Sequence, residues 1–453
     1  MAKKKTLYVC SDCGSDYSKW QGQCSDCGAW NTLSEMRHAA PSRNAGVGAG
    51  YAGAADGEVK RLAEIDLQEL PRISSGGHEF DLVLGGGLVP GSCVLIGGEP
   101  GAGKSTLLLQ TLCHLAESME TLYVTGEESP QQVAMRAKRL GLATDKLNIM
   151  AETSVETICH TAEKRQPKIL VVDSIQVVHL ADINSAPGSV SQVREAAAQL
   201  VRFAKQTGTV LLLVGHVTKD GTLAGPKVLE HMIDCSLMLE GSGDSRFRTL
   251  RGIKNRFGAV NELGVFAMTE AGLKEVNNPS AIFLSRADEV ASGSLVTVVW
   301  EGTRPLLVEL QALVDESPFN NPRRVVVGLD HNRLAMLLAV LHRHGGIMAA
   351  DQDVFVNIVG GVKVVETSAD LPLLLAVVSS FRDQTLPSDL IAFGEVGLSG
   401  ELRPVPSGVE RLREAAKHGF KRAIVPVANA PRQPIKGMEI IAAKTLAEAL
   451  EGL

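Results

Sequence analysis

Long apolar runs are missing from this chain of 453 residues. No stretch reaches the 18 or so apolar residues that a membrane-spanning helix needs. The lysines at positions 3–5 are followed by cysteines and polar residues, so the apolar core of a signal peptide is missing too. We therefore expect a cytoplasmic protein without a membrane partner. A short-period internal repeat is also absent.

An excess of positive charge is missing as well. The formal net charge is −6, which argues against a uniformly basic, histone-like nucleic-acid binder. A protein of this composition can still bind DNA through one local basic surface, so the charge does not decide the partner. The composition is otherwise that of a soluble globular protein, and the length allows about three domains, each with its own core.

Four of the eight cysteines form one tight pattern, in which two C-x-x-C pairs stand ten residues apart. Two such pairs can present four thiolates to one tetrahedral metal ion, and Gly14 and Gly28 follow them where a tight turn is needed. A segment of about 30 residues has too small a core of its own, so the metal supplies the folding energy. We predict a C4 zinc finger over residues 1–35 with one structural zinc. Its ligands are Cys10, Cys13, Cys24 and Cys27.

A redox-active C-x-x-C is the alternative, but two matched pairs that flank a short loop are not a thioredoxin pattern. Trp20 and Trp30 are interpreted as packing beside the zinc knuckles, with stacking on bases or on a partner as the alternative. The remaining cysteines stand in apolar or helical contexts and are predicted to be plain core residues. They are Cys93, Cys113, Cys159 and Cys235.

The segment Gly98–Ser105 matches G-x-x-x-x-G-K-[ST] in full, between the apolar run 92–96 and an apolar helix over 107–112. This order of strand, loop and helix is that of a phosphate-binding P-loop. The glycines let backbone N–H groups surround a triphosphate, Lys104 reaches the β- and γ-phosphates, and the Ser105 hydroxyl binds Mg²⁺. ATP with Mg²⁺ is the predicted cofactor. The predicted nucleotide-binding residues are Gly98, Glu99, Pro100, Gly101, Ala102, Gly103, Lys104, Ser105 and Thr106.

Two acidic strand ends would complete an ATP site. The apolar strand 169–173 ends in Asp173, a Walker B pattern that would hold Mg²⁺ through water opposite Ser105. The strand 122–125 delivers Glu127 and Glu128 to the same sheet edge, and hydrolysis needs a carboxylate that activates water. Glu127 is the first choice for this role and Glu128 the second. The alternative is that one of them caps the helix that begins near Ser129.

The chain order predicts four parts. The zinc finger is followed by a flexible linker over 36–60, rich in Gly, Ala, Ser and Pro. Short apolar strands then alternate with helices over 61–276, which predicts a largely parallel sheet with ligands at the strand C-termini. A turn-rich break at 277–280 precedes a second α/β stretch over 284–453.

At this point the sequence resembles the RadA (Sms) family of bacterial DNA repair proteins. The resemblance rests on the P-loop, on the two acidic strand ends, on the segment Gly215–Gly221, and above all on the pentapeptide KNRFG, a family hallmark. It spans nearly the whole chain. It implies an α/β fold with a RecA-like P-loop core, the C4 zinc finger and a C-terminal α+β domain similar to the Lon protease domain. The pentapeptide residues are Lys254, Asn255, Arg256, Phe257 and Gly258.

The resemblance also implies a function. It predicts a DNA-dependent ATPase that assembles as a homo-hexameric ring on single-stranded DNA and drives branch migration of recombination intermediates during repair. A RecA-type recombinase or a replicative helicase is a possible protein partner. In such rings ATP sits between subunits and the neighbour contributes cations to the γ-phosphate. Lys254 and Arg256 are the candidates, and a solvated basic turn is the alternative.

Two segments at strand C-termini are predicted to line the DNA channel, namely 181–193 and 218–227. Lys219, Lys227 and Arg194 could contact phosphates without reading sequence, although neither segment carries an aromatic residue for base stacking. Exposed loop cations without a ligand are the alternative. His216 could sense the γ-phosphate, or it could be a plain strand-end histidine.

The Lon resemblance, clearest at 393–405, raises the alternative of an ATP-dependent protease or protein remodeller. A Lon-type site uses a serine activated by a lysine that can lose its proton. Ungapped alignment places Ser368 and Arg411 at those positions, and a guanidinium stays protonated at physiological pH. We therefore expect a noncatalytic domain that joins subunits or offers DNA a basic face. That face would comprise Arg403, Arg411, Arg413, Lys417, Lys421 and Arg422.

Overall fold

The computed structural model describes two compact units, residues 1–276 and 277–453. The described residues are 6–10, 13–37, 71–216, 227–241, 246–276, 278, 280, 284, 291–318, 321–361 and 363–453. Most of the predicted linker and the start of the predicted ATPase domain therefore lie outside them. Within the described ranges, no helix combines the length and apolarity that crossing a membrane requires.

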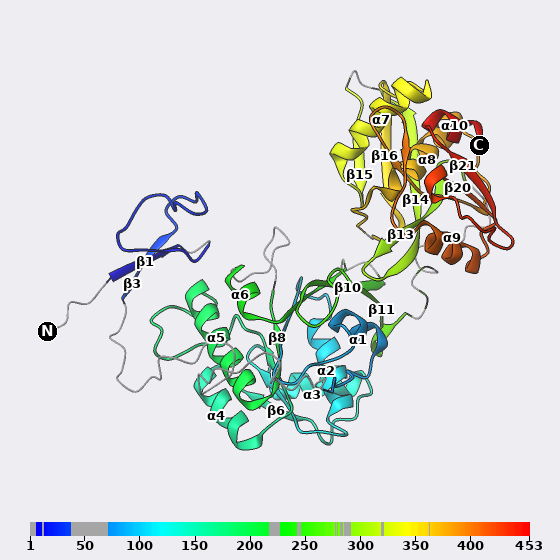
Figure 1. The fold of residues 1–453 in the computed structure, drawn as a ribbon. Helices are drawn as coiled ribbons and strands as arrows, with labels where there is room; N and C mark the ends of the chain where they lie inside the picture. The colour runs from blue at the N-terminus through cyan, green and yellow to red at the C-terminus, as the bar shows by residue number, and fades with distance from the viewer. Residues whose placement is uncertain are drawn as a thin grey trace, which may run out of the picture. The chain divides into compact units, whose positions relative to one another are not determined.

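The N-terminal module is a small three-stranded antiparallel sheet, drawn in blue in Figure 1. Its strands are β1 (Thr6–Cys10), β2 (Asp16–Tyr17) and β3 (Leu33–Arg37), in the order β2-β1-β3. The predicted tight turns are present, because the N–H groups of Gly14 and Gly28 donate to the carbonyls of Cys10 and Cys24, each at 2.9 Å. Both glycines have positive φ, at 78° and 73°, which only glycine adopts without strain.

The ATPase region contains one nine-stranded sheet of order β12-β11-β10-β9-β4-β8-β7-β5-β6. The six strands from β9 to β6 pair in parallel, as the sequence predicts. These are β4 (Cys93–Gly98), β5 (Thr121–Thr125), β6 (Asn148–Ala151), β7 (Ile169–Asp173), β8 (Val210–Val214) and β9 (Cys235–Glu240).

Three antiparallel strands that the sequence analysis did not predict extend this sheet beyond β9. They are β10 (Phe247–Asn255), β11 (Leu263–Thr269) and β12 (Gly272–Glu275). Lys254 and Asn255 therefore end a strand, where the sequence indicated only a polar stretch, with a solvated basic turn as the alternative. β10 was missed because Arg248, Arg251 and Lys254 interrupt its apolar residues, although Arg248 is buried against the P-loop and donates to the Ala102 carbonyl at 3.2 Å.

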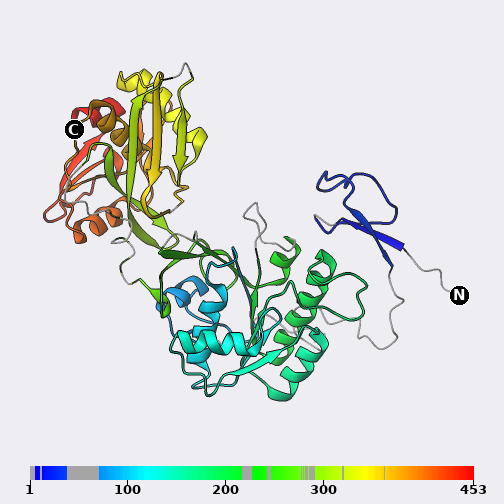
Figure 2. The same cartoon turned by 180° about the vertical axis from the view of Figure 1, so that it is seen from behind.

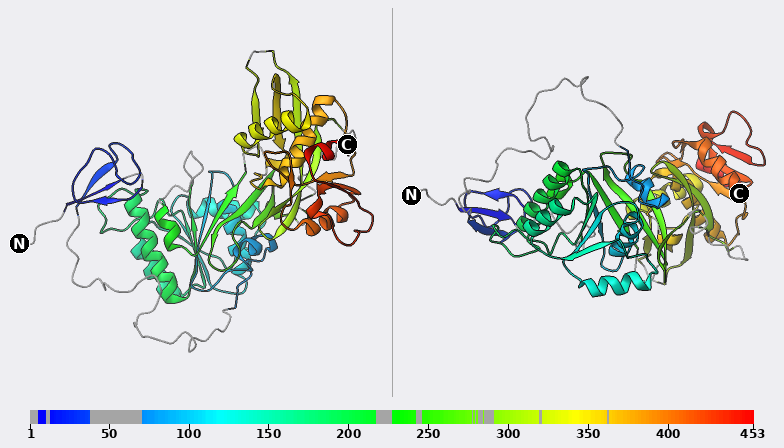
Figure 3. Two further views of the ribbon diagram at one scale, coloured as in Figure 1. Left: turned by 45° about the horizontal axis from the view of Figure 1, so that its top comes forward. Right: turned by 90° about the horizontal axis from the view of Figure 1, so that it is seen from below.

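Helices cover both faces of the sheet (Figure 3). One apolar cluster joins the sheet to α1 (His78–Leu84), α2 (Lys104–Leu115) and α3 (Pro130–Arg139). The other joins it to α4 (Val155–Arg165), α5 (Val190–Thr207) and α6 (Lys227–Met232). Successive residues of β4 and β8 alternate between the two clusters, because a strand points its side chains to opposite faces in turn. A doubly covered sheet keeps its ligands at the strand ends.

The C-terminal unit contains a mixed seven-stranded sheet of order β15-β16-β14-β13-β17-β20-β21 (Figure 2). Its strands are β13 (Ser294–Glu301), β14 (Arg304–Glu316), β15 (Arg324–Val327), β16 (Gln352–Ile358), β17 (Leu390–Ala392), β20 (Arg422–Pro426) and β21 (Glu439–Ala443). The helices are α7 (His331–Gly345), α8 (Asp370–Arg382), α9 (Gly408–Lys417) and α10 (Leu446–Glu451). A two-stranded hairpin, β18 (Glu395–Val396) and β19 (Leu402–Arg403), lies after β17.

Candidate functional site

The predicted P-loop connects the end of β4 to the start of α2, as the motif requires. Gly98, Gly101 and Gly103 all have positive φ. At Gly98 a Cβ atom would stand 2.4 Å from the Leu239 carbonyl oxygen, so no other residue fits there. The loop ends at the first turn of α2, whose unpaired N–H groups favour an anion.

The Lys104 ammonium lies inside this loop. Its side chain is almost completely buried, and Nζ donates to the carbonyls of Gly98 at 2.7 Å and Glu99 at 2.9 Å. Burial lowers the pKa of Lys104, and the carboxylates of Asp173 and Glu127 oppose that shift. These two acids are therefore close enough to act on the ammonium, as expected of groups that share one phosphate site.

Asp173 ends β7 and is buried. Its Oδ2 accepts a hydrogen bond of 2.6 Å from the hydroxyl of Tyr123, on the neighbouring strand β5. Burial, together with the Asp173 charge, raises the pKa of Tyr123 well above its usual value, so the phenol stays a donor. Tyr123 was not predicted as a site residue. The one hint in the sequence was its phenol hydroxyl, a polar group within an apolar strand.

Glu127 follows β5 and faces the same site. Its Oε1 accepts a hydrogen bond from the Ser174 hydroxyl and lies 3.2 Å from His216 Nε2. Partial burial opposes ionisation, but the contacts with Ser174 and His216 and the charge of Lys104 outweigh it and lower the pKa of Glu127. The site therefore holds Glu127 as a carboxylate. His216 contacts this carboxylate, and Ser174 is a contact that the sequence analysis did not single out.

Glu128 points elsewhere, because its carboxylate pairs with Arg136 of α3. Neither glutamate caps α3. Ser129 is the N-cap, accepting a hydrogen bond from the Gln132 N–H, while the Gln132 side chain accepts one from the Ser129 N–H. The alternative of a capping role for Glu127 therefore finds no support in the geometry.

The KNRFG residues lie at the opposite edge of the sheet from the P-loop. Asn255 of β10 pairs with Cys235 of β9, which pairs with Val94 near the start of β4. The P-loop follows the other end of β4. Val94 lies four residues before Gly98, so at about 3.3 Å per residue Asn255 lies about 13 Å from the P-loop along the strand direction.

Both cations of the motif have partners in their own subunit. Lys254 Nζ donates to the carbonyls of Glu230 and Ile233, the latter at 2.9 Å. Arg256 donates from Nη1 to Asp234 Oδ1 at 3.2 Å and from Nη2 to the His231 carbonyl at 3.3 Å, and its side chain remains 53% exposed. The guanidinium of Arg256 is thus held by Asp234 and His231 while its side chain stays half exposed to solvent.

The predicted DNA-binding residues have different outcomes. Arg194 lies in α5, where it is exposed and forms a 3.1 Å ion pair with Glu195. The end of the predicted loop 181–193 is therefore helical, because α5 begins at Val190. Lys227 begins α6 and not a loop. The side chain of Lys227 and the whole of Lys219 lie outside the described residues.

The four predicted zinc ligands converge. The sulfur atoms of Cys10, Cys13, Cys24 and Cys27 all lie within 4.8 Å of one another. The Sγ atoms of Cys10 and Cys27 are 3.6 Å apart, and those of Cys13 and Cys24 are 3.4 Å apart. Four thiolates about 2.3 Å from a tetrahedral zinc ion stand about 3.8 Å from each other, so the cluster fits zinc closely.

Trp20 and Trp30 are 56% and 68% exposed, and both rings lie beside Gly22, just before the second cysteine pair, so they sit next to the knuckle without being buried. Cys93, Cys113, Cys159 and Cys235 are all buried, as expected of core residues.

Ser368 and Arg411 meet at one carboxylate in the C-terminal unit. Glu366 accepts hydrogen bonds from the Ser368 hydroxyl at 2.5 Å and from Nη1 and Nη2 of Arg411, both at 2.8 Å. Arg411 is completely buried and also donates to the carbonyls of Val298 and Pro406. The Ser368 hydroxyl is therefore hydrogen-bonded to the Glu366 carboxylate, whose charge is neutralised by the Arg411 guanidinium.

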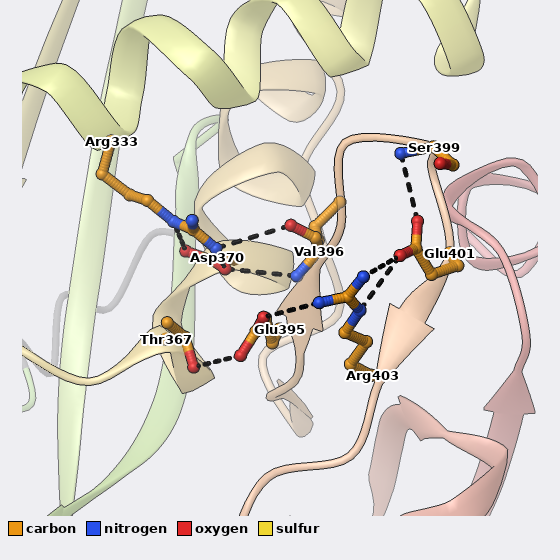
Figure 4. A network of polar contacts seen from close by, with 8 residues as sticks. All are labelled: Arg333, Thr367, Asp370, Glu395, Val396, Ser399, Glu401 and Arg403. Atoms are coloured by element: carbon orange, nitrogen blue, oxygen red, sulfur yellow. Dashed lines mark hydrogen bonds and ion pairs between the residues drawn. The ribbon is translucent and has the colours of Figure 1, made fainter.

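The structure removes Arg411 from the predicted basic face and gives three other members acidic partners, while Arg413 and Lys421 are exposed. Arg411 is buried, while Arg403 pairs with Glu401 at 2.6 Å and Glu395 at 3.7 Å (Figure 4). Lys417 pairs with Glu414 at 2.9 Å, and Arg422 pairs with Asp389 at 2.5 Å. Acidic neighbours thus offset the charge of Arg403, Lys417 and Arg422. The prediction took only the cations into account.

Figure 4 also shows what holds the β18–β19 hairpin on the domain. The Asp370 carboxylate accepts hydrogen bonds from Arg333 of α7 and from the Val396 N–H. Thr367 donates to Glu395 at 2.8 Å. The segment that carries the Lon resemblance is therefore tied to α7 and α8 by side-chain pairs.

Full-length relatives settle the family. The chain is 69% identical over 455 residues to "DNA repair protein RadA" of Escherichia coli (strain K12), and 48% identical to the protein of that name from Bacillus subtilis (strain 168). Both alignments cover 99% of each chain. The chain belongs to the RadA family.

Family profiles match three parts of this RadA-family chain. Residues 77–222 match a profile described as "AAA domain", residues 8–35 match "Rubredoxin metal binding domain", and residues 333–429 match "Subunit ChlI of Mg-chelatase". The predicted fold class is confirmed: a P-loop core with a parallel sheet, an N-terminal zinc ribbon and a C-terminal domain of the ChlI and Lon type. The ribbon and the cysteine cluster together support one structural zinc.

Removal of the metal should unfold the zinc ribbon of this RadA-family chain and leave the ATPase domain folded. Zinc contributes about 10–16 kcal/mol of folding energy in small zinc modules, which exceeds what a three-stranded sheet can supply. Chelation should release one zinc per chain and abolish the slow hydrogen exchange of residues 6–37. Cys159→Ala, in the core of the ATPase domain, is the control and should keep its zinc. A metal-free chain with unchanged protection at 6–37 would contradict this prediction.

Proposed function

We propose that this protein is a DNA-dependent ATPase of recombination and repair that works as a ring, a homo-hexamer, on single-stranded DNA and drives branch migration. The family and the AAA-type P-loop domain support the ATPase. The observation that supports the ring is that the KNRFG segment lies at the end of β10, at the sheet edge opposite the P-loop of its own subunit. From that edge its cations can reach an ATP molecule only in a neighbour.

Within the site, Lys104 would bind the β- and γ-phosphates, and Ser105 and Asp173 would hold Mg²⁺, which neutralises phosphate charge when bound. Tyr123 would fix the Asp173 carboxylate through its 2.6 Å hydrogen bond. Glu127 would orient and deprotonate the attacking water, since Ser174 and His216 hold it ionised. His216 would report the state of Glu127 to the chain that follows it toward Lys219 and Lys227.

Lys254 and Arg256 would act in trans on the γ-phosphate of the adjacent subunit. The exposure of Arg256 supports this role, because its guanidinium has five N–H donors and hydrogen bonds to Asp234 and His231 use two of them. Arg194, Lys219 and Lys227 remain proposed phosphate contacts for single-stranded DNA or branched intermediates. A RecA-type recombinase or a replicative helicase remains a proposed partner.

The C-terminal domain is proposed to be a noncatalytic scaffold. A Ser–Lys mechanism needs an amine that gives up its proton. Arg411 cannot do this, because a guanidinium stays protonated at physiological pH and this one also makes two hydrogen bonds to the Glu366 carboxylate. Ser368 Oγ donates to the same carboxylate, and Ser368 is itself buried, so its hydroxyl is not open to a substrate. The alternative function as a protease or protein remodeller is therefore the weaker one.

Stimulation of ATP hydrolysis separates the two functions. We expect single-stranded DNA to raise kcat at least fivefold, whereas an unfolded protein substrate should change it less than twofold and should not be cleaved. The stimulation should fall steeply between about 50 and 200 mM salt, as phosphate contacts do. Stimulation by unfolded protein instead of DNA would favour the alternative.

A further inference from the structure

Asp234 is a buried acid directly beside the KNRFG cations. It lies between the end of α6 and the start of β9, and its side chain is 3% exposed. A buried carboxylate is costly unless it is paired and hydrogen-bonded. Its partners therefore indicate what it is for.

The two carboxylate oxygens of Asp234 have different partners. Oδ2 accepts hydrogen bonds from Lys205 Nζ at 2.5 Å and from the Cys93 N–H at 3.0 Å. Oδ1 accepts from Arg256 Nη1 at 3.2 Å. Lys205 and Cys93 thus hold one oxygen against α5 and the first residue of β4, and the other oxygen is directed at Arg256.

The main chain of Asp234 also forms hydrogen bonds with Arg256 and Cys93. The Arg256 N–H donates to the Asp234 carbonyl at 3.0 Å, and the Asp234 N–H donates to the Cys93 carbonyl at 3.0 Å. Arg256 is therefore attached to Asp234 at both ends, by its backbone and by its guanidinium. Asp234 is in turn attached to β4, the strand that carries the P-loop of the same subunit.

The negative charge of Asp234 also offsets the positive charges around it. Lys205, Lys254 and Arg256 bring three cations to this corner of the domain. Burial and the charge of Arg256 both lower the pKa of Lys254, while Asp234 opposes that shift. Without the Asp234 charge, Arg256 would turn away from Lys254 and from the fixed geometry that a phosphate contact needs.

We infer that Asp234 is a positioning residue that aims Arg256 at the ATP of the neighbouring subunit. This inference rests on the proposed role of Arg256 in trans. Among the described residues, the side-chain hydrogen bonds of Asp234 go to Lys205, Cys93 and Arg256 and none goes to the P-loop, so it would act on a bound ATP only through Arg256. Replacing it should lower the turnover of the neighbour's site and leave ATP binding in its own subunit unchanged.

Mixed rings test this directly. Arg256→Ala subunits keep an intact ATP site but give no arginine, and Lys104→Ala subunits give an arginine but turn over no ATP. In an equal mixture about half of the subunits keep an ATP site, and in a head-to-tail ring about half of those sites have a neighbour that supplies Arg256. The mixture should therefore recover about a quarter of the wild-type turnover. The decisive mixture replaces the second partner with Lys104→Ala/Asp234→Asn. Its recovery should be at least fivefold lower.

Two variants separate positioning from damage. Lys104→Ala/Asp234→Glu keeps the buried charge but lengthens the side chain, so it should recover an intermediate rate. Lys104→Ala/Lys205→Gln changes the same buried cluster without touching the bond to Arg256, so it should recover at least half as much as Lys104→Ala. As a homogeneous ring, Asp234→Asn should show kcat lowered about tenfold and a Kd for ATP within twofold of the parent.

Each outcome has one meaning. If no mixture recovers turnover, the role of Arg256 in trans is wrong, and the inference falls with the proposed function. If Lys104→Ala restores turnover and the Asp234→Asn double variant restores it equally, only the inference about Asp234 is wrong. Equal losses with Lys205→Gln and Asp234→Asn would show general destabilisation and would also overturn it.

Discussion

Replacement of Lys104 by alanine is expected to lower kcat for ATP hydrolysis at least 1000-fold, which corresponds to about 4 kcal/mol of transition-state stabilisation. Loss of one fixed hydrogen-bond donor at a developing oxyanion already costs about 10²–10³ in rate, and Lys104 contributes a full charge from a buried position. Its two present acceptors, the carbonyls of Gly98 and Glu99, belong to the P-loop itself. Nothing else in the loop can take its place. The measurement is steady-state phosphate release with and without single-stranded DNA.

Lys164→Ala is the matched control, because Lys164 is an exposed lysine of α4. It should change kcat less than twofold. Branch migration by Lys104→Ala should be lost together with turnover. Turnover within tenfold of the parent would remove Lys104 from the site and leave the P-loop without its phosphate-binding cation.

The parts of the ATP site that could be predicted are those that one short segment determines. The P-loop is such a segment, because its spacing of glycines, lysine and serine is itself the geometry that binds phosphate. The two C-x-x-C pairs are another. In both cases the residues that act together are near neighbours in the sequence, so no knowledge of the tertiary fold was needed.

The contacts that could not be predicted join distant segments. Tyr123 and Asp173 are 50 residues apart, and Glu127 and Ser174 are 47 apart. They meet because β5 and β7 are neighbours in the sheet, and the strand order does not follow the order of the chain. Arg411 of α9 and Glu366 are 45 residues apart and also meet only through the tertiary fold. A strand pattern predicts that an acid ends a strand, but not which side chain will face it.

The strand β10 shows a different limit. Three cations interrupt its apolar residues and obscured its strand pattern, yet β10 pairs with β9 and β11 along most of its length. Pairing with neighbours decides strand formation at such positions more than local propensity does. Because β10 carries Lys254 to the start of β4, its strand conformation also places the KNRFG cations away from the P-loop of their own subunit.

Replacement of Glu127 by glutamine is the second variant with a large expected effect. A general base contributes about 10²–10⁴ in rate, so kcat should fall at least 100-fold. ATP binding should survive, because glutamine keeps an oxygen that can accept the Ser174 hydrogen bond. The measurement combines phosphate release with the Kd for ATP from equilibrium binding. A trapped ATP-bound ring on DNA is the expected product.

The pH dependence of kcat tests the direction of the pKa shift of Glu127. The pKa of Glu127 is lowered, so its carboxylate stays ionised above that value, and protonation removes it only as the pH falls through the lowered pKa. The parent should therefore keep its Glu127-dependent rate at pH values down to the ordinary range of glutamate, about 4.3.

Glu128→Gln is the control for charge at this sheet edge. It removes the ion pair with Arg136 of α3 and leaves Glu127 with its contacts to Ser174 and His216. Its kcat should stay within threefold of the parent, because an ion pair that is partly exposed contributes only about 0–1 kcal/mol. If Glu128→Gln lost the rate and Glu127→Gln kept it, the water-activating role would pass to Glu128. Such a result would require Arg136 to release that carboxylate when ATP binds.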